Sequence, residues 1–299
     1  MYIMNDYVVS CCSAVDLTPE LLKEYGLRCL PFFYTVGEDT YEDDMFTTVS
    51  AEVFYGKMEE GLMTGTSQNN VSRYTEYFEP ILKEGLDILH ITLSSGLSGT
   101  YSAACIAAEE LMEKYPERKI RVVDSRGACG GYGLLVIEAA DLKKQGLSLD
   151  ELAAKTEELR FHIHHWFFST TLVYYIRGGR ISKTAGVFAS ALNICPLNNM
   201  DESGHLIVRE KVRTKKKVRN TIVERMAQHA EGGTDYSGRV FVNYSGADDS
   251  DCDEVIRLIK ERFPKISELR KLHIGPTIGA HTGPGTVAVF FNGDSRVGT

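Results

Sequence analysis

Hydrophobic and polar positions in the first half of the chain follow two periods in turn. Short apolar runs at residues 7–10, 86–93 and 120–124 have the length of buried strands. After the second run, apolar residues recur every three to four positions, which is the period of an amphipathic helix. Strands that alternate with helices of about 10–15 residues predict a parallel sheet covered on both faces. One helix is predicted to begin at residue 19, and four others are predicted to span residues 71–78, 101–112, 134–146 and 149–162.

The pattern changes near residue 160, where the strict alternation of strands and helices ends. The segment at 205–212 alternates as a half-exposed strand after a polar turn, which indicates antiparallel pairing. We therefore predict an α/β fold with two domains, a parallel-sheet α/β domain of residues 1–160 and a smaller α+β domain of residues 161–299. Its strands are expected at 166–170, 205–212, 240–244 and 286–291, and its helices at 182–192, 218–226 and 255–263.

Composition and charge exclude several classes of protein. The chain has 299 residues, with 43% hydrophobic and 25% charged residues, as in ordinary globular proteins. The net charge of -8 argues against a nucleic-acid partner, which requires a basic face. No apolar run approaches the roughly 20 residues of a membrane span, and no signal-peptide pattern is present. Seven scattered cysteines without a C-x-x-C pair do not predict disulfides. We expect a cytoplasmic protein without an integral membrane segment.

Small hydroxyl residues and glycines gather where the strand at 86–93 is followed by a helix. The segment reads SSGLSGT at residues 94–100 and contains Ser94, Ser95 and Ser98. Free N–H groups at the start of a helix attract anions, and open α/β sheets bind ligands where strands end. The alternative is a plain turn in which Ser98 caps the helix.

Two other segments offer similar chemistry. The segment TGTSQNN at residues 64–70 is rich in hydroxyl and amide groups, and Asn70 is a plausible cap for the following helix. A glycine-rich turn is predicted at residues 279–285, where His281 lies among small residues and could approach a ligand closely. If these turns converge, they could hold one anionic group. The alternative for residues 64–70 is an ordinary loop, and the alternative for His281 is a structural role. Spacing along the sequence does not decide whether the segments form a site.

The motif RGGR at residues 177–180 could present an arginine toward a carboxylate, a phosphate or a partner protein. Its alternative is a helix end with solvated arginines. His162, His164 and His165 have no matching carboxylate or cysteine cluster in the sequence, so no metal site is predicted.

Familiar enzyme motifs are absent from the sequence, including a phosphate-binding P-loop, a zinc-protease helix and a complete G-x-S-x-G elbow. Cys12 and His281 could in principle form a thiol nucleophile and its base, but their spacing gives no reason to pair them. A small hydrolase or transferase that uses Cys12 or a serine of the crevice remains the alternative function.

Taken together, the segments TSQ at 66–68, SSGLSGT at 94–100, GGRI at 178–181 and GAHTGPG at 279–285 resemble the motifs of the DegV family in order and spacing. The resemblance covers essentially the whole chain. It implies a two-domain protein that holds a long-chain fatty acid in the crevice between its domains. It further implies a non-catalytic subunit of bacterial fatty acid kinase, whose separate kinase subunit phosphorylates the carboxylate to an acyl phosphate.

The resemblance also implies roles for individual residues. Thr66 and either Ser94 or Ser95 would hydrogen-bond the carboxylate. Ser67, His281 and Thr282 would belong to the same network of polar groups. Arg180, with Arg177, would contact the kinase subunit. No metal and no cofactor are implied, because the fatty acid is the ligand.

Two positions depart from the family pattern. Cys12-Ser13 stands where an Asp-Ser pair usually follows the first strand, and Asn69 stands where proline usually follows Thr-Ser-Gln. Both departures concern the expected head-group end of the ligand, whereas the apolar tunnel does not depend on them.

Overall fold

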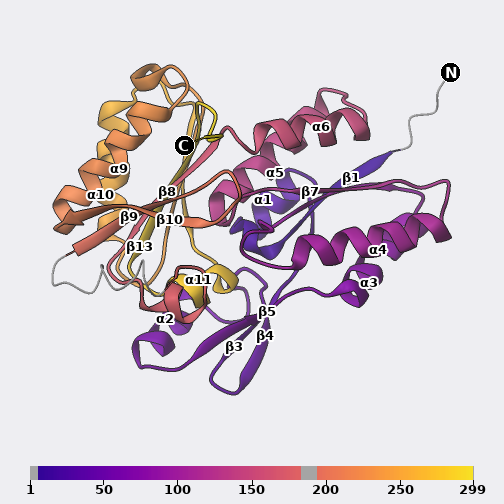
Figure 1. The fold of residues 1–299 in the computed structure, drawn as a ribbon, viewed down its shortest axis with the longest axis horizontal. Helices are drawn as coiled ribbons and strands as arrows, with labels where there is room; N and C mark the ends of the chain where they lie inside the picture. The colour runs from indigo at the N-terminus through magenta and orange to yellow at the C-terminus, as the bar shows by residue number, and fades with distance from the viewer. Residues whose placement is uncertain (1–5, 183–193, 299) are drawn as a thin grey trace.

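The computed structural model describes residues 6–182 and 194–298 and contains two large β-sheets on either side of the helix α5 (Cys129–Lys144) and a third, small sheet (Figure 1). The helix predicted at residues 182–192 therefore lies outside the described residues, apart from Ser182. The described elements confirm the predicted α/β class and add a small sheet that the sequence did not reveal.

The first sheet is entirely parallel, as predicted. Its strands, in order across the sheet, are β2 (Arg28–Leu30), β1 (Tyr7–Cys12), β6 (Asp87–Thr92) and β7 (Ile120–Asp124). One face packs against α3 (Val71–Lys83) and α4 (Thr100–Lys114), and the other against α5 (Cys129–Lys144) and α6 (Leu149–Leu159). Every residue of β6 is buried, including the polar Asp87, His90 and Thr92.

Local sequence fixes the starts of several helices. The helix α1 (Pro19–Glu24) begins with proline at its first turn, and the Thr18 side chain accepts a hydrogen bond from the Leu21 amide. Asn70 caps α3 by accepting from the Arg73 amide, as the sequence predicted.

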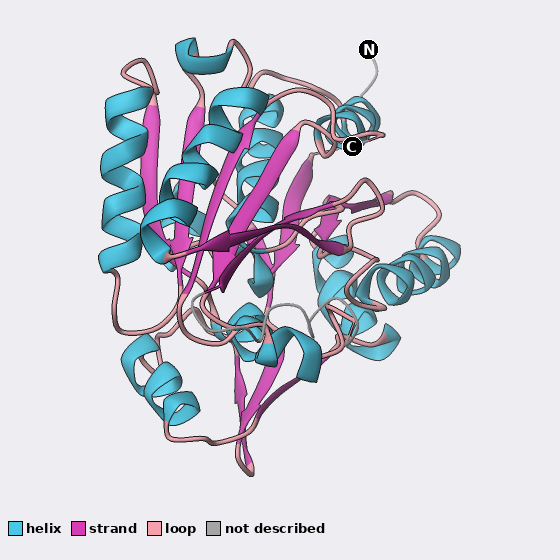
Figure 2. Ribbon diagram, turned by 60° about the vertical axis from the view of Figure 1, so that its left-hand side comes forward, coloured by secondary structure: helices cyan, strands magenta, loops and turns pink. Residues whose placement is uncertain are grey.

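The second sheet has six strands and is mostly antiparallel. In order across the sheet they are β10 (Leu206–Arg213), β9 (Ile194–Met200), β8 (Ile163–Ser169), β13 (Thr286–Asn292), β11 (Arg239–Tyr244) and β12 (Glu268–His273). Only the pair β11–β12 is parallel among these strands. The helices α9 (Lys215–His229) and α10 (Ser250–Arg262) cover its outer face (Figures 1 and 2).

The helix α5 lies between the two large sheets. It packs against β1 of the parallel sheet and against β8, β11 and β13 of the second sheet. Most of its residues from Cys129 to Ala140 are buried, and its stretch from Cys129 to Ile137 carries no charged residue on any side. A helix without a polar face is stable only when it is covered all round. The two-domain division remains a prediction, because α5 joins both sheets in one continuous core.

A third, antiparallel sheet corrects two sequence predictions. It consists of β4 (Asp39–Glu42), β3 (Phe33–Val36) and β5 (Thr64–Ser67), and it packs with α2 (Ala51–Glu59) and α11 (Pro276–Thr282). The predicted turn at 64–70 is therefore a strand in its first half, and much of the predicted turn at 279–285 is helix. Gly279 lies inside α11, where a Cβ atom would be 2.5 Å from the Tyr55 hydroxyl. Close packing, rather than a turn, requires this glycine.

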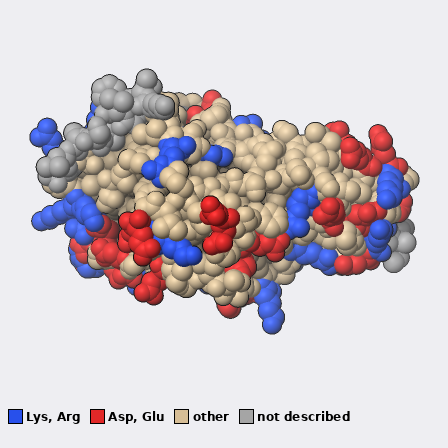
Figure 3. Space-filling view, turned by 90° about the horizontal axis from the view of Figure 1, so that it is seen from below, with Lys and Arg blue, Asp and Glu red and all other residues tan. Residues whose placement is uncertain are grey.

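No helix in the described part of the chain is long and apolar enough to cross a membrane. On the face that Figure 3 shows, acidic and basic side chains are interspersed.

Candidate ligand-binding site

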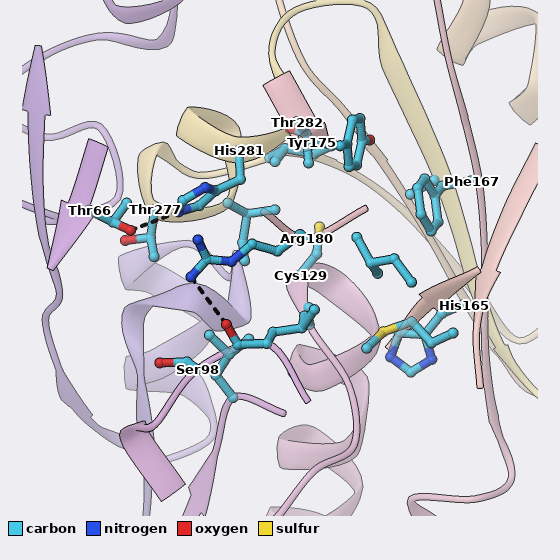
Figure 4. A pocket seen from close by; sticks show the side chains of 18 of the residues that line it. Thr66, Ser98, Cys129, His165, Phe167, Tyr175, Arg180, Thr277, His281 and Thr282 are labelled. Atoms are coloured by element: carbon cyan, nitrogen blue, oxygen red, sulfur yellow. Dashed lines mark hydrogen bonds between the residues drawn. The ribbon is translucent and has the colours of Figure 1, made fainter. Parts of the chain in front are cut away.

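A cavity of about 400 Å³ lies where the three sheets meet (Figure 4). This volume is within the usual range for small-molecule sites. Its walls come from β5, the turn before α4, the start of α5, the strands β8 and β13, and the helices α7 (Val173–Arg177) and α11. Thr66, His281 and Arg180 lie toward one end of the cavity, and Phe167 and His165 lie toward the other.

Thr66 and His281 form the centre of the polar end. The Thr66 Oγ1 atom is 2.7 Å from Nε2 of His281, although 215 residues separate the two positions. Thr66 is held in β5 by its pairing with Tyr34 of β3, and α11 packs against both strands. The structure thus brings together two of the segments that the sequence singled out.

Close packing fixes the His281 ring. A Cβ atom added to Gly178 would lie 2.3 Å from Nδ1 of His281, so only glycine leaves room for the imidazole. Burial, and to a lesser extent the charge of Arg180, lowers the pKa of His281 to about 4. The ring is therefore neutral at pH 7 in the ligand-free protein. Its buried Nδ1 atom has no hydrogen-bond partner among the described residues.

Asp43 fixes the start of α11. Its carboxylate accepts hydrogen bonds from the hydroxyl and the amide of Thr277, and from the Met45 amide at 3.2 Å. Thr277 lines the cavity, but its hydroxyl is directed to Asp43 rather than to a ligand. These bonds hold the helix that carries His281.

Arg180 lines the cavity near its polar end. Its guanidinium donates to the Leu97 carbonyl at 3.1 Å and to the Gly178 carbonyl. Gly179 has φ of 73°, a left-handed conformation that favours glycine and turns the chain toward the cavity. Arg177 is exposed instead, and its guanidinium lies over the Tyr174 ring at 5.5 Å. The two arginines of the motif therefore have different surroundings.

The three serines of the turn before α4 have different positions. Ser94 is fully buried, and its hydroxyl donates to the Gly204 carbonyl at 2.9 Å. Neither Ser94 nor Ser95 lines the cavity, whereas Ser98 does. The residue that caps α4 is Gly99, so Ser98 is not the cap; its hydroxyl lies 2.8 Å from that of Thr100. The geometry therefore favours Ser98 as the serine that reaches a ligand at this wall. The assignment of Ser94 or Ser95 as the residue that hydrogen-bonds the carboxylate remains a prediction.

Ser67 and Thr282, the other predicted site residues, both line the cavity. Ser67 is exposed. The buried Thr282 hydroxyl has no partner among the described residues, so it is available to a bound group.

The apolar end is built on paired residues of β8 and β13. Phe167 lies opposite Ala288, and His165 lies opposite Phe290, so these four side chains form one wall of the cavity. Burial holds the pKa of His165 well below its ordinary value, so this ring is neutral as well. Sequence reasoning did not assign these residues to the site. The segment 163–169 reads IHHWFFS without alternation of polar and apolar residues, and all of it is buried, so the sequence contained no signal for which side chains face the cavity.

Cys12 has no access to the cavity. It is fully buried, and its sulfur lies 3.2 Å from the Tyr74 hydroxyl and 3.6 Å from Nε2 of His90. Burial raises the pKa of the Cys12 thiol to about 12, so the reactive thiolate is scarce at pH 7. The suggested pairing of Cys12 with His281 is wrong, because His90 occupies that place and His281 bonds Thr66.

The arrangement suits an amphiphilic anion. One end offers hydroxyl groups and a neutral imidazole, and the other end is lined by aromatic and aliphatic side chains. A carboxylate requires hydrogen-bond donors when it leaves water, and an alkyl chain requires an apolar surface.

Comparison with known proteins finds relatives over nearly the whole chain. A family model described as "Uncharacterised protein, DegV family" matches residues 11–294. A DegV domain-containing protein of Clostridium perfringens is 36% identical over 293 residues, which cover 98% of this chain and 99% of the relative.

Solved structures share the fold. A DegV family protein from Thermus thermophilus, described as fatty acid binding, is 26% identical and superimposes with a TM-score of 0.85 over 97% of this chain and 100% of that one. The Streptococcus pneumoniae Fatty Acid Kinase (Fak) B3 protein, loaded with linoleic acid, is 21% identical and has a TM-score of 0.82, with coverage of 97% and 100%. On the family model and on identity over nearly its whole length, the chain belongs to the DegV family.

Proposed function

We propose that this protein binds a long-chain fatty acid in the cavity between its sheets, with the carboxylate at the end formed by Thr66 and His281. The observation that carries this proposal is the hydrogen bond between these two side chains at the polar end of an otherwise apolar cavity. The Thermus thermophilus structure supports it, since that protein is described as fatty acid binding.

The two ends of the ligand would contribute differently. Burial of the alkyl chain stabilises the complex by about 0.8 kcal/mol per methylene, which reaches the order of 10 kcal/mol for a long chain before ordering costs. The polar end mainly orients the carboxylate, because an ionised carboxyl without donors would bind a proton instead. Ser67, Ser98 and Thr282 are the further hydroxyl groups that we assign to this end, with Ser94 holding the turn that carries Ser98.

We further propose that the protein has no catalytic centre of its own and presents the carboxylate to a separate fatty acid kinase subunit, which forms an acyl phosphate. The Fak B3 protein of Streptococcus pneumoniae has the same fold, and its name connects that fold with a fatty acid kinase. The buried Cys12, whose thiol pKa burial raises to about 12, disfavours an enzyme with a thiol nucleophile at this position. A cytoplasmic location remains a prediction.

Bound lipid tests the first proposal directly. The protein, purified without detergent, is expected to release about one fatty acid per chain on denaturing extraction, as measured by mass spectrometry, because the buried chain dissociates slowly. An unrelated protein carried through the same purification is the control. If no fatty acid is found even after incubation with oleate, the binding proposal fails.

Arg180 tests the second proposal. The change Arg180→Ala is expected to preserve oleate binding but to slow phosphorylation of bound oleate by the kinase subunit at least about tenfold, because guanidinium groups bind phosphate oxygens in pairs. The half-buried Arg180 and the exposed Arg177 would together face the kinase. The measurement compares lipid retention with acyl phosphate formation.

The matched control is Arg257→Ala on the outer helix α10, where the arginine pairs with Glu254 at 2.8 Å. This variant is expected to behave like the parent in both assays. If Arg180→Ala loses the lipid, Arg180 belongs to the ligand site and its assignment to the kinase is wrong.

A further inference from the structure

His164, His229 and Asp294 form a cluster on the face of β8 that points away from the cavity. Nε2 of His164 lies 2.9 Å from Oδ1 of Asp294, and Nδ1 of His229 lies 3.2 Å from the same oxygen. Within residues 6–182 and 194–298, this is the one group of three histidine, cysteine or acidic side chains whose donor atoms all lie within 4.8 Å of one another.

The three residues come from different elements. His164 lies in β8, His229 is the last residue of α9, and Asp294 follows β13 by two positions. The sequence offered no carboxylate partner for His164, because Asp294 is 130 residues away. The neighbouring His165 faces the opposite side of the strand and lines the ligand cavity.

Aromatic packing holds the two imidazole rings in place. The rings of His164 and His229 are stacked, with centroids 4.9 Å apart and an angle of 23° between their planes. Phe291 stacks against His164, and Trp166 stacks against His229. Both rings are therefore ordered before any ion arrives, which reduces the entropy lost on binding.

The donor set selects a class of ion. Two imidazole nitrogens and one carboxylate oxygen suit Zn²⁺ and related divalent transition metals, whereas Mg²⁺ and Ca²⁺ prefer oxygen ligands alone. Ligands at about 2.0–2.2 Å from Zn²⁺ lie roughly 3–3.5 Å apart in a tetrahedral site. The two separations from the Asp294 oxygen are 2.9 and 3.2 Å, and all three donor atoms lie within 4.8 Å of one another. The ion would replace the protons that these groups now share in hydrogen bonds.

Solvent can reach the cluster from one side. The Asp294 side chain is 58% exposed and that of His229 is 25% exposed, whereas His164 is 4% exposed and forms the floor of the site. This arrangement gives an ion an entry path and leaves room for water as a fourth ligand.

We propose that His164, His229 and Asp294 bind one divalent transition-metal ion, with Zn²⁺ as its representative. Such an ion would connect β8, the end of α9 and the segment after β13. Because it lies on the other side of β8 from the cavity, this site is separate from the proposed lipid site and does not depend on it.

Calorimetric titration of the untagged, EDTA-treated protein with Zn²⁺ tests the proposal. We expect one ion per chain, and an upward shift of the thermal unfolding midpoint in Zn²⁺, because a ligand that binds only the folded state stabilises it. His229→Gln and Asp294→Asn are each expected to weaken Zn²⁺ binding at least about tenfold. His164 is left unchanged, because its buried ring contributes to the core.

His205→Gln is the matched control, because His205 is exposed and lies outside the cluster. It should bind Zn²⁺ like the parent. The proposal is overturned if the parent binds no Zn²⁺, or if His229→Gln and Asp294→Asn bind it as tightly as the parent. It is also overturned if the bound ion, replaced by Co²⁺, shows thiolate absorption, because cysteines would then be the ligands.

Discussion

Replacing Thr66 with valine or His281 with alanine is expected to weaken oleate binding about 10- to 100-fold for each change. A hydrogen bond to a charged group contributes about 1.5–3 kcal/mol, and each 1.4 kcal/mol is a factor of ten in affinity. Valine preserves the branched shape that Thr66 has in β5, so the strand and its pairing with Tyr34 should persist. Binding should not vanish, because the apolar end still holds the alkyl chain.

The fold-loss of oleate affinity in the double variant Thr66→Val/His281→Ala should be smaller than the product of the fold-losses in the two single variants. The two side chains are 2.7 Å apart and bond to each other, so removal of either one already alters the other. Contacting residues are not additive for this reason. A complete double-mutant cycle would thus measure the coupling within the polar end.

The measurement is displacement of a fluorescent fatty acid from delipidated protein, with circular dichroism as the check on folding. Thr40→Val is the matched control, because Thr40 lies in β4 of the same small sheet and its side chain is exposed. If the double variant binds oleate as tightly as the parent and Thr40→Val, the carboxylate is held elsewhere in the cavity.

The second large effect is expected at Gly178, a residue that has no side chain to offer a ligand. In Gly178→Ala the new methyl group would lie 2.3 Å from Nδ1 of His281, which forces the ring to move away from Thr66. The backbone itself tolerates alanine, because φ is -74° and ψ is -7°. We therefore expect Gly178→Ala to bind oleate as weakly as His281→Ala, about tenfold or more below the parent.

Gly56→Ala is the matched control for this change. Gly56 lies in α2 with nothing within 4 Å of an added Cβ, so alanine should raise the free energy of unfolding by about 0.5–1 kcal/mol and leave binding unchanged. The combination Gly178→Ala/His281→Ala should bind no more weakly than His281→Ala alone, because the clash is gone. Additive losses would show that Gly178 acts through something other than the His281 ring.

Local pattern was sufficient for the parallel sheet. The aliphatic residues of β6 and the three-to-four-residue period of α4 are local patterns, so they can be recognised without knowledge of the rest of the chain. The Asn70 cap is local in the same way, since it bonds an amide three residues on.

The incorrect predictions of secondary structure concern segments whose structure depends on residues far away in the sequence. The strand β5 has a sequence of threonines, glycine and serine that reads as a loop, and it becomes a strand because β3 pairs with it. The helix α11 is short and rich in small residues. It packs against Tyr55, and the Asp43 carboxylate fixes its first turn. Local propensity is a weak guide where tertiary packing decides.

Local patterns and motifs in the chain were enough to predict the parallel sheet, the likeness to a family and the kinds of side chain available to a carboxylate. The contact of Thr66 with His281, the place of Ser98 rather than Ser94 at the cavity wall, and the contact of Asp294 with two histidines became known from the three-dimensional arrangement alone. Separation along a chain does not determine separation in space. The packing of the two large sheets on α5, and of the small sheet on α2 and α11, sets those distances, and residues more than a hundred positions apart become neighbours.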